Sequence, residues 1–367
     1  MSKPRRRKQK KQVKAELKLR QFAATELSDQ LAALPCAADL PRFMVDTVAG
    51  AYTPADAELM IGGFGAAATR PVTLRTNTLK ATAEDIAAAL DAVGIAHNPV
   101  AWYPDAFILP DAQVSDLWDL DIYRDGKIYL QSLSSMMPPL VLGAQAGEDI
   151  LDMCAAPGGK TTQIAALTQG QAHLTACEMS IPRAEKLEAN LHRQGAKNVP
   201  VMRIDARELD EFFRFDRILL DAPCTGTGTV VSGNEKSLRG LTEQLLSKCA
   251  RSQRALLDRA MGALKPGGTL VYSTCSILPQ ENEDALQEAL DKHMDCELIP
   301  LDGTPSESEA RRAQEAGEKP RIESNALTEA IAAGQVSAIA NGLPGTLTIP
   351  PSRDFEGFYI ALIRKRS

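Results

Sequence analysis

The feature that most restricts the fold of this chain is the alternation of strand-like and helix-like segments after residue 148. Short apolar runs that predict strands lie at residues 149–153, 173–178, 200–204, 217–221 and 269–273. Segments with helical spacing lie at residues 160–167, 182–194, 242–264 and 280–293. Parallel neighbours in a sheet need a long crossover connection, which is usually a helix. The pattern therefore predicts an α/β fold with a mostly parallel, doubly wound sheet, to which residues 355–365 would add a final edge strand.

The chain before this region is organised differently. Residues 21–66 carry apolar side chains at three- and four-residue spacing, which predicts a helical lead-in. Short strand and helix signals follow, and they predict a small α+β domain over residues 67–146. We therefore expect four parts: a basic disordered tail (1–20), the lead-in (21–66), the small domain (67–146) and the α/β domain (147–367).

Two local expectations concern the connections between these parts. The stretch at residues 127–142 reads as a strand that turns into a helix, and Pro138 and Pro139 would end or kink that helix. Residues 302–320 are polar and are expected to form a mobile loop.

The composition excludes several classes of protein. With 44% hydrophobic and 24% charged residues, the chain can bury a core and is neither disordered nor fibrous. It has no uncharged apolar stretch near the roughly 18 residues of a membrane helix, and its first residues lack the apolar segment of a secretory signal. Its 7 cysteines include no CxxC pair, which argues against a disulfide framework and against a zinc site. We therefore expect a cytoplasmic monomer with reduced thiols that binds neither a membrane nor a metal.

The net charge of -6 conceals a strong asymmetry along the chain. Residues 1–20 contain ten Lys or Arg against Glu16 alone, a net charge of +9 that leaves -15 on the remaining residues. A basic arm on an acidic body is typical of a protein that binds a polyanion, because Lys and Arg displace counterions from phosphates. A solubilising tail or a localisation signal would have the same composition, so the tail alone leaves these alternatives open.

The segment LDMCAAPGGKTTQIA, which begins at Leu151, is the most informative one. It predicts a strand, a turn of small residues from Cys154 to Gly159, and a helix from Lys160. Such a turn lets backbone N–H groups and a helix N-terminus approach a ligand closely. A P-loop is excluded because Cys154 stands where it needs glycine, and a GxGxxG motif is absent. A purely structural turn remains the alternative.

Two acidic residues at later strand ends favour a ligand. Glu178 follows the second strand, where a carboxylate can accept hydrogen bonds from the two hydroxyls of an adenosine ribose. Asp205 follows the third strand and would meet the adenine amino group by the same logic. Either residue could instead be a helix cap, but the three strand ends together predict an adenosine-containing ligand.

Two cysteines follow the next two strands. Cys224 lies in the sequence Asp-Ala-Pro-Cys and Cys275 in Ser-Thr-Cys-Ser. If these strands are neighbours, about 4.8 Å apart, both thiols reach one crevice. A thiolate that adds to carbon 6 of a pyrimidine makes carbon 5 nucleophilic enough to accept a methyl group. The alternatives are small buried hydrophobes, a disulfide or a metal site, and a metal would need further ligands that the neighbouring sequence does not supply.

Together these motifs resemble one enzyme family. DMCAAPGGKT, DAPCTGTG, LKPGGTLVYSTCS and ENE, with RPVTLRTN upstream and GFYIA near the end, resemble the Sun/Nop-type RNA cytosine-C5 methyltransferases. The similarity extends over about residues 70–367. It implies a Rossmann-like S-adenosylmethionine methyltransferase domain, preceded by a small RNA-recognition domain, that modifies rRNA or tRNA.

The resemblance also implies a role for each site residue. Cys275 matches the family nucleophile, Cys224 matches the cysteine that assists product release, and Asp221 would orient the cytosine edge. Lys160 would help to organise the pocket. S-adenosylmethionine would be bound by Cys154, Ala155, Ala156, Pro157, Gly158, Gly159, Lys160, Glu178, Asp205 and Asp221.

Two other functions stay open at this point. A DNA cytosine-C5 methyltransferase would use Cys224 as its nucleophile and would not need Cys275. A non-catalytic RNA-binding factor in ribosome assembly would fit the basic tail but has no need of both thiols. The sequence also departs from the family, because the arginine-rich stretch that often follows the PC motif is missing. Lys236 and Arg239 remain there as weaker candidates for phosphate contacts.

Deletion of residues 1–20 is predicted to weaken RNA binding without changing the nucleotide that is modified. Contacts to phosphates carry no sequence information, and their loss makes binding less sensitive to salt. Binding titrations at several salt concentrations and mapping of the methylated base would test this prediction. A change of target nucleotide in the truncated protein would contradict it.

Overall fold

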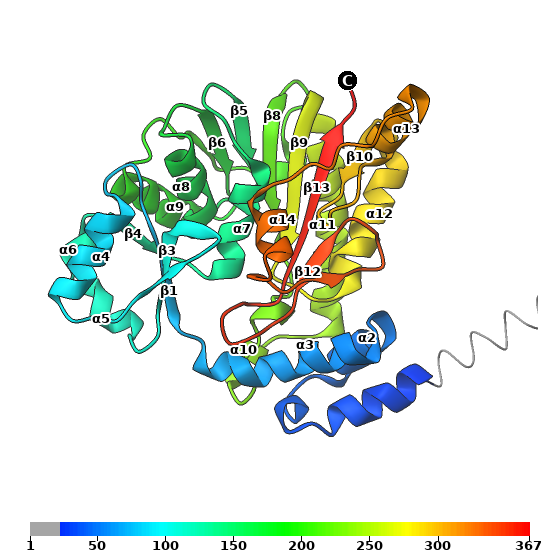
Figure 1. The fold of residues 1–367 in the computed structure, drawn as a ribbon, viewed down its shortest axis with the longest axis horizontal. Helices are drawn as coiled ribbons and strands as arrows, with labels where there is room; N and C mark the ends of the chain where they lie inside the picture. Colours follow the sequence, from blue (N-terminus) through cyan, green and yellow to red (C-terminus); the bar gives the residue numbers. More distant parts are fainter. Residues whose placement is uncertain (1–22) are drawn as a thin grey trace, which may run out of the picture.

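A computed structural model describes residues 23–367, so the predicted basic tail at residues 1–20 lies outside the described residues (Figure 1). Residues 23–32 are helical, and the helices α2 (Arg42–Ala51) and α3 (Pro54–Ala66) follow. In Figure 1 these helices lie below the large sheet, and the small domain lies to its lower left. The lead-in shares a hydrophobic cluster with Val230 and Ile277, each in the segment after one of the two predicted site cysteines.

The small domain is built on a four-stranded antiparallel sheet with the order β2-β3-β1-β4. Helix α4 covers it and begins with a capping box between Thr82 and Asp85. Leu74, Ile86 and Phe107 are among the buried residues of its core. Its elements are β1 (Val72–Thr76), α4 (Ala83–Ala92), β2 (Asn98–Val100), β3 (Tyr103–Leu109), α5 (Val114–Trp118), α6 (Asp121–Arg124) and β4 (Ile128–Leu130).

The large sheet has nine strands, of which eight follow the order β11-β12-β13-β9-β8-β5-β6-β7. The strands from β9 to β7 are parallel to one another, whereas β13 runs antiparallel to β9 and also pairs with β10. The predicted α/β fold with a mostly parallel sheet is therefore confirmed. The strands are β5 (Asp149–Asp152), β6 (His173–Cys177), β7 (Val201–Met202), β8 (Phe215–Asp221), β9 (Leu264–Thr274), β10 (Cys296–Ile299), β11 (Ile339–Ala340), β12 (Leu347–Ile349) and β13 (Phe358–Lys365).

Two hydrophobic clusters cover the two faces of this sheet. Val271 of β9 and Ile360 of β13 point into the cluster that contains residues of α7, α8 and α9. Their neighbours Leu270 and Tyr359 point into the cluster that contains residues of α11 and α12. The alternation arises because successive side chains of a strand face opposite sides of the sheet. The helices are α7 (Leu133–Leu142), α8 (Gly159–Leu167), α9 (Ile181–Gln194), α10 (Glu235–Leu238), α11 (Glu243–Ala263), α12 (Glu283–Lys292), α13 (Glu307–Ala316) and α14 (Ala326–Ala332).

Three expectations about local structure were wrong. The last strand, β13, is not at the edge, because it is flanked by β9 on one side and by β10 and β12 on the other. Residues 302–320 contain the helix α13, which Ser306 caps by accepting from the Glu309 amide. The polar composition of this segment is also typical of a loop, and for that reason the N-cap and the helical spacing of its charged residues were overlooked.

The third correction concerns α7, which continues through Pro138 and Pro139 to Leu142. A proline at position 139 cannot donate to the carbonyl of Ser135. That carbonyl instead accepts a hydrogen bond of 2.9 Å from the Gln131 side chain. Helix α7 packs against β8, β9 and β13. The segment that connects the two domains is therefore part of the large domain.

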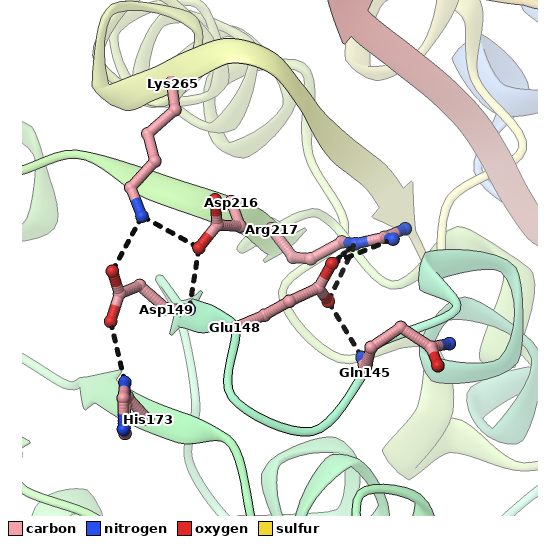
Figure 2. A network of polar contacts seen from close by, with 7 residues as sticks. All are labelled: Gln145, Glu148, Asp149, His173, Asp216, Arg217 and Lys265. Carbon is pink, nitrogen blue, oxygen red and sulfur yellow. Dashed lines mark hydrogen bonds and ion pairs between the residues drawn. The ribbon is translucent and has the colours of Figure 1, made fainter.

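A network of charged side chains joins the starting ends of the parallel strands (Figure 2). Lys265 of β9 donates to Asp149 of β5 at 2.7 Å and to Asp216 of β8 at 2.8 Å. Asp216 also accepts from the Asp149 amide, and His173 of β6 contacts the Asp149 carboxylate at 3.0 Å. Four strands are thus joined at the edge opposite to the predicted site.

Arg217 adds a second connection in the same region of Figure 2. It pairs with Glu148 at 3.0 Å and donates to the Leu142 carbonyl at 2.7 Å. Glu148 in turn accepts from the Gln145 amide. The last turn of α7 is therefore attached to β8 by hydrogen bonds as well as by apolar packing.

Lys265→Met is predicted to lower the free energy of unfolding by about 1 kcal/mol at pH 7, a small value because water screens these partly exposed pairs. Hydrogen bonding to Lys265 holds the pKa of Asp149 below its ordinary value. This stabilisation is present above the unfolded pKa of about 4 and is lost as the pH falls through the folded value. Urea unfolding between pH 7 and pH 3 should therefore show the difference from wild type shrinking toward low pH.

Lys292→Met provides the control for this experiment, since it removes a single exposed pair with Glu288. Its effect should be smaller than that of Lys265→Met at pH 7. A Lys265→Met difference that stayed constant down to pH 3 would contradict the assigned cause.

Candidate active site

The carboxyl ends of the parallel strands surround a pocket of about 280 Å³, which we call the strand-end pocket. Crevices at this edge are the usual ligand sites of open α/β sheets. Eight of the predicted site residues line it: Cys154, Ala155, Ala156, Pro157, Gly159, Lys160, Asp221 and Cys275. Gly158, Glu178, Asp205 and Cys224 are not among its lining residues but belong to the segments around it.

The loop from Cys154 to the start of α8 is shaped by glycine. Gly158 has a φ of +107°, a backbone conformation that side chains with a Cβ rarely adopt, and a Cβ there would lie 2.9 Å from Leu187. A Cβ on Gly159 would lie 3.2 Å from the Tyr129 ring of the small domain. The loop therefore brings backbone and a helix N-terminus close to the pocket, as the sequence predicted.

Side chains hold this loop from several directions. Thr161 of α8 donates to Asp152 at the end of β5 over 2.7 Å. Arg183 and Asn190 of α9 donate to the carbonyls of Ala156 and Pro157 at 2.8 and 2.7 Å. These hydrogen bonds hold parts of the backbone of residues 154–159, which we call the cofactor loop after the prediction made for it.

The two predicted adenosine-binding acids both lie at strand ends and both have local partners. Glu178 is 4% exposed, accepts from the Ser180 amide at 2.8 Å and pairs with Arg183 at 3.2 Å. Asp205 caps a short 3-10 helix and pairs with Arg207, whose hydrogen bonds hold the pKa of the carboxyl below its ordinary value. The capping role that the sequence left open is therefore present for Asp205.

Lys160 and Asp221 form an ion pair inside the strand-end pocket. The Lys160 Nζ donates to Asp221 and to Ser135, at 2.7 Å in each case. Asp221 also accepts from Ser273 at 2.8 Å. Burial favours the neutral amine, but the charge of Asp221 outweighs it and raises the pKa of Lys160. The pocket therefore holds a fixed ammonium beside a fixed carboxylate.

The two predicted site thiols are adjacent. The sulfur atoms of Cys224 and Cys275 are 3.1 Å apart. This follows from the register of β8 and β9, in which Asp221 is paired with Ser273. The hydrogen bond that Cys224 shares with Cys275 and the burial of its thiol both raise the pKa of Cys224 well above its ordinary value. Cys224 therefore keeps its proton near neutral pH.

Cys154 is the third thiol near the pocket, and burial raises its pKa well above the ordinary value. It therefore remains a neutral thiol beside Asp152 and is unsuited to be a nucleophile.

Several residues of the site had not been identified from the sequence. Glu281 is wholly buried and accepts from the Thr225 amide and hydroxyl at 2.7 and 2.5 Å. Gln253 of α11 donates to the Pro223 carbonyl at 3.0 Å. These contacts hold the loop that carries Cys224. The ENE motif, which begins at Glu281, was the available signal.

A second group of unpredicted residues closes the pocket from the opposite side. Ser132 and Ser134, at the start of α7, donate to the side chain and the carbonyl of Glu356 at 2.6 and 2.8 Å. Phe358 lines the pocket, with its ring 5.5 Å from the Lys160 Nζ. The GFYIA motif next to Glu356 marks this segment in the sequence.

The weaker candidates for RNA contacts lie elsewhere. Lys236 in α10 and Arg239 just after it are exposed and do not line the strand-end pocket.

Within residues 23–367, no group of three or more His, Cys, Asp or Glu side chains is arranged to hold a metal ion. In the same part of the chain, no helix is both long and apolar enough to cross a membrane.

Comparison with known families gives two matches. The sequence model described as "16S rRNA methyltransferase RsmB/F" matches residues 139–364. The model of a ferredoxin-like domain of RsmF/B-like methyltransferases matches residues 40–115. The two matches together cover most of both sheets, and β4 of the small sheet lies between them.

Curated relatives carry related names. The "Ribosomal RNA small subunit methyltransferase F" of Vibrio parahaemolyticus is 35% identical over 318 residues, which are 84% of this chain and 60% of that protein. The human "28S rRNA (cytosine(4447)-C(5))-methyltransferase" is 39% identical over 237 residues, 63% of this chain and 29% of that protein. The chain thus spans well under two thirds of the length of these relatives.

Solved structures have the same fold. A methyltransferase homolog from Pyrococcus horikoshii has a TM-score of 0.69 and 31% identity over 93% of this chain and 99% of its own. NSun6 from the same organism, solved with SFG, also has a TM-score of 0.69, over 89% of this chain and 98% of its own. Its identity is 22%, so this likeness shows the fold alone.

Asp152→Asn is predicted to change how stability depends on pH. Asp152 is 1% exposed, and this burial raises its pKa to about 6. Because the folded pKa lies above the unfolded value of about 4, the wild type should lose up to about 3 kcal/mol of stability between pH 4 and pH 7.5. The asparagine variant cannot ionise and can still accept from Thr161, so it should lack this loss. Urea unfolding at four pH values would test this, and parallel pH profiles for the two proteins would refute it.

Proposed function

The chain belongs to the RsmB/F family of 16S rRNA methyltransferases, and from this premise we propose that it transfers a methyl group from S-adenosylmethionine to carbon 5 of a cytosine in rRNA. The observation that carries the proposal is the pair of sulfur atoms, Cys224 and Cys275, 3.1 Å apart at the strand-end pocket. Because the chain spans about 60% of the Vibrio relative, the choice of RNA is part of the proposal. A tRNA substrate is the other RNA class to be tested.

The residues present fit an adenosine-containing methyl donor. The loop after β5 packs closely against Leu187 and Tyr129 because Gly158 and Gly159 carry no Cβ, and its other residues line the pocket directly before the start of α8. Glu178 supplies a buried carboxylate at the end of β6. When bound, S-adenosylmethionine would supply the electrophilic methyl group that is transferred.

Cys275 is proposed as the nucleophile because it lines the pocket, whereas Cys224 does not. Its thiolate adds to carbon 6 of the cytosine, and the new C–S bond makes carbon 5 nucleophilic. After carbon 5 has accepted the methyl group, with S-adenosylhomocysteine as the leaving group, a base removes the proton from that carbon. The C–S bond then breaks, and the thiolate of Cys275 and the methylated base are released.

Asp221 and Lys160 are proposed to hold the cytosine during these steps. A carboxylate accepts from the exocyclic amino group of cytosine, which is the donor on that edge of the base. Lys160 donates to Asp221 and so fixes the orientation of its carboxylate. Asp221 would therefore select cytosine over uracil, which offers a carbonyl oxygen at that position.

Cys224 is proposed to assist product release. Its raised pKa keeps a proton on its sulfur, which hydrogen-bonds with the sulfur of Cys275. This proton can stabilise the thiolate of Cys275 when the C–S bond breaks. Glu281 and Gln253 maintain the position of Cys224 through the backbone of its loop.

The two thiols are predicted to respond differently to substitution. Cys275→Ser should abolish turnover and covalent adduct formation, because a serine hydroxyl is almost wholly un-ionised near pH 7. Cys224→Ser should permit attack and methyl transfer but slow release, so that a covalent protein–RNA complex accumulates. A denaturing gel with S-adenosylmethionine and cytosine-containing rRNA, tRNA or DNA measures both effects and distinguishes the substrates.

Cys249→Ser is the matched control, since Cys249 is a free thiol on α11 that does not line the strand-end pocket. It should behave as wild type. A trapped complex from Cys275→Ser and none from Cys224→Ser would reverse the roles and favour the chemistry of DNA methyltransferases. The absence of methylation and adduct with every nucleic acid would favour a non-catalytic RNA-binding factor.

A further inference from the structure

Arg75 is a charged residue that the proposed reaction does not use, although it lies next to the site. It belongs to β1 of the small domain and is 0% exposed. It forms no ion pair within the described part of the chain, and its Nη1 has no hydrogen-bond partner there. A buried guanidinium without a carboxylate is costly, so its position calls for a role that offsets the cost.

Hydrogen bonds from Arg75 join the small domain to the large domain. Its Nη2 donates to the Gly159 carbonyl at 2.9 Å and to the Thr162 hydroxyl at 2.7 Å. Both acceptors lie in the first turn of α8, directly after the cofactor loop. Its Nε donates to Gln131 at 2.9 Å, just after β4. One side chain thus connects the small sheet with the helix whose N-terminus faces the strand-end pocket.

Arg75 also supports the wall of that pocket. Its guanidinium lies 5.2 Å from the centre of the Tyr129 ring, and both Tyr129 and Gln131 line the pocket. Gln131 donates onward to the Ser135 carbonyl and to Gln163 of α8, at 2.9 and 3.1 Å. The partners of Arg75 therefore form one continuous buried network from β1 to the cofactor loop.

We propose that Arg75 is a positioning residue through which the small domain sets the affinity for S-adenosylmethionine and couples it to RNA binding. The inference rests on the proposed function, because it assumes that the small domain contacts RNA and that the strand-end pocket binds this cofactor. RNA that holds the small domain in place fixes Arg75 against α8, and the cofactor then binds a loop that is already ordered. By linkage, bound cofactor must strengthen RNA binding by the same factor.

Lys80 provides a matched control on the same domain boundary. Its Nζ donates to the Arg193 carbonyl at the end of α9 over 2.7 Å, so it also joins the small domain to the large one. It is exposed, and the acceptors of its Nζ are the carbonyls of Asp125 and Arg193, neither of which belongs to α8 or to the cofactor loop. Lys80→Met thus weakens the domain contact without removing the link that Arg75 makes.

The test uses the full chain and measures the Kd for S-adenosylmethionine by calorimetry, with and without unmodified 16S rRNA transcribed in vitro. Arg75→Met should raise this Kd about tenfold, the effect of losing one to two buried hydrogen bonds, and should abolish the change that RNA produces. Arg75→Lys should recover part of the affinity, because an ammonium can reach one acceptor but lacks the planar fork. Lys80→Met should leave the cofactor affinity and the coupling as in wild type.

Steady-state kinetics separate positioning from general damage. Arg75→Met should raise the KM for S-adenosylmethionine while kcat at saturating cofactor stays within about twofold of wild type. If Arg75→Met does not fold, Thr162→Val removes one of the two acceptors of Arg75 on α8, together with the hydrogen bond from Thr162 to the Gly158 carbonyl, and should raise the Kd about threefold. An unchanged cofactor affinity in a folded Arg75→Met, or an equal loss in Lys80→Met, would overturn the inference. Wild-type protein that binds no S-adenosylmethionine would instead refute the proposed function.

Discussion

The parallel pairing of β8 and β9, which is continuous from the Arg217–Thr269 pair to the Asp221–Ser273 pair, is the constraint on which the site depends. It places Asp221 beside Ser273, and Cys224 and Cys275 follow three and two residues later in the sequence. A shift of one residue in this register would turn the side chains to the other face of the sheet. The 3.1 Å separation of the two sulfurs is therefore fixed by backbone hydrogen bonds far more than by the thiols themselves.

The site at the carboxyl edge of the sheet depends in addition on a balance between acidic and basic side chains. Asp152, Asp221 and Glu178 bring three carboxylates to neighbouring strand ends, and burial opposes the ionisation of Asp152. Lys160 compensates by pairing with Asp221 inside the pocket. The small domain adds Arg75 just behind the pocket wall, so both domains contribute a cation to an otherwise acidic region.

The sequence was sufficient to predict those features whose signal is local or that follow from the order of the strands. The turn after β5 could be recognised from its small residues, and the meeting of Cys224 and Cys275 followed from the expectation of adjacent parallel strands. Contacts between distant segments were not predictable. Pro139 is tolerated inside α7 because Gln131 hydrogen-bonds to the freed Ser135 carbonyl, and no periodicity reveals that pairing. The interior position of β13 likewise depends on two short strands, β10 and β12, with weak patterns of their own.

The order of the large sheet has a consequence for its outer limits. The strands at its two ends, β7 (Val201–Met202) and β11 (Ile339–Ala340), are two residues long each. A long unpaired strand offers a row of free N–H and C=O groups to which another chain can add, and this is a common start of aggregation. Two residues offer almost no such template. β10 (Cys296–Ile299), which pairs with β13 alone, adds a free edge of four residues. With the longer β13 enclosed between other strands, the free edges of the sheet within residues 23–367 are all short.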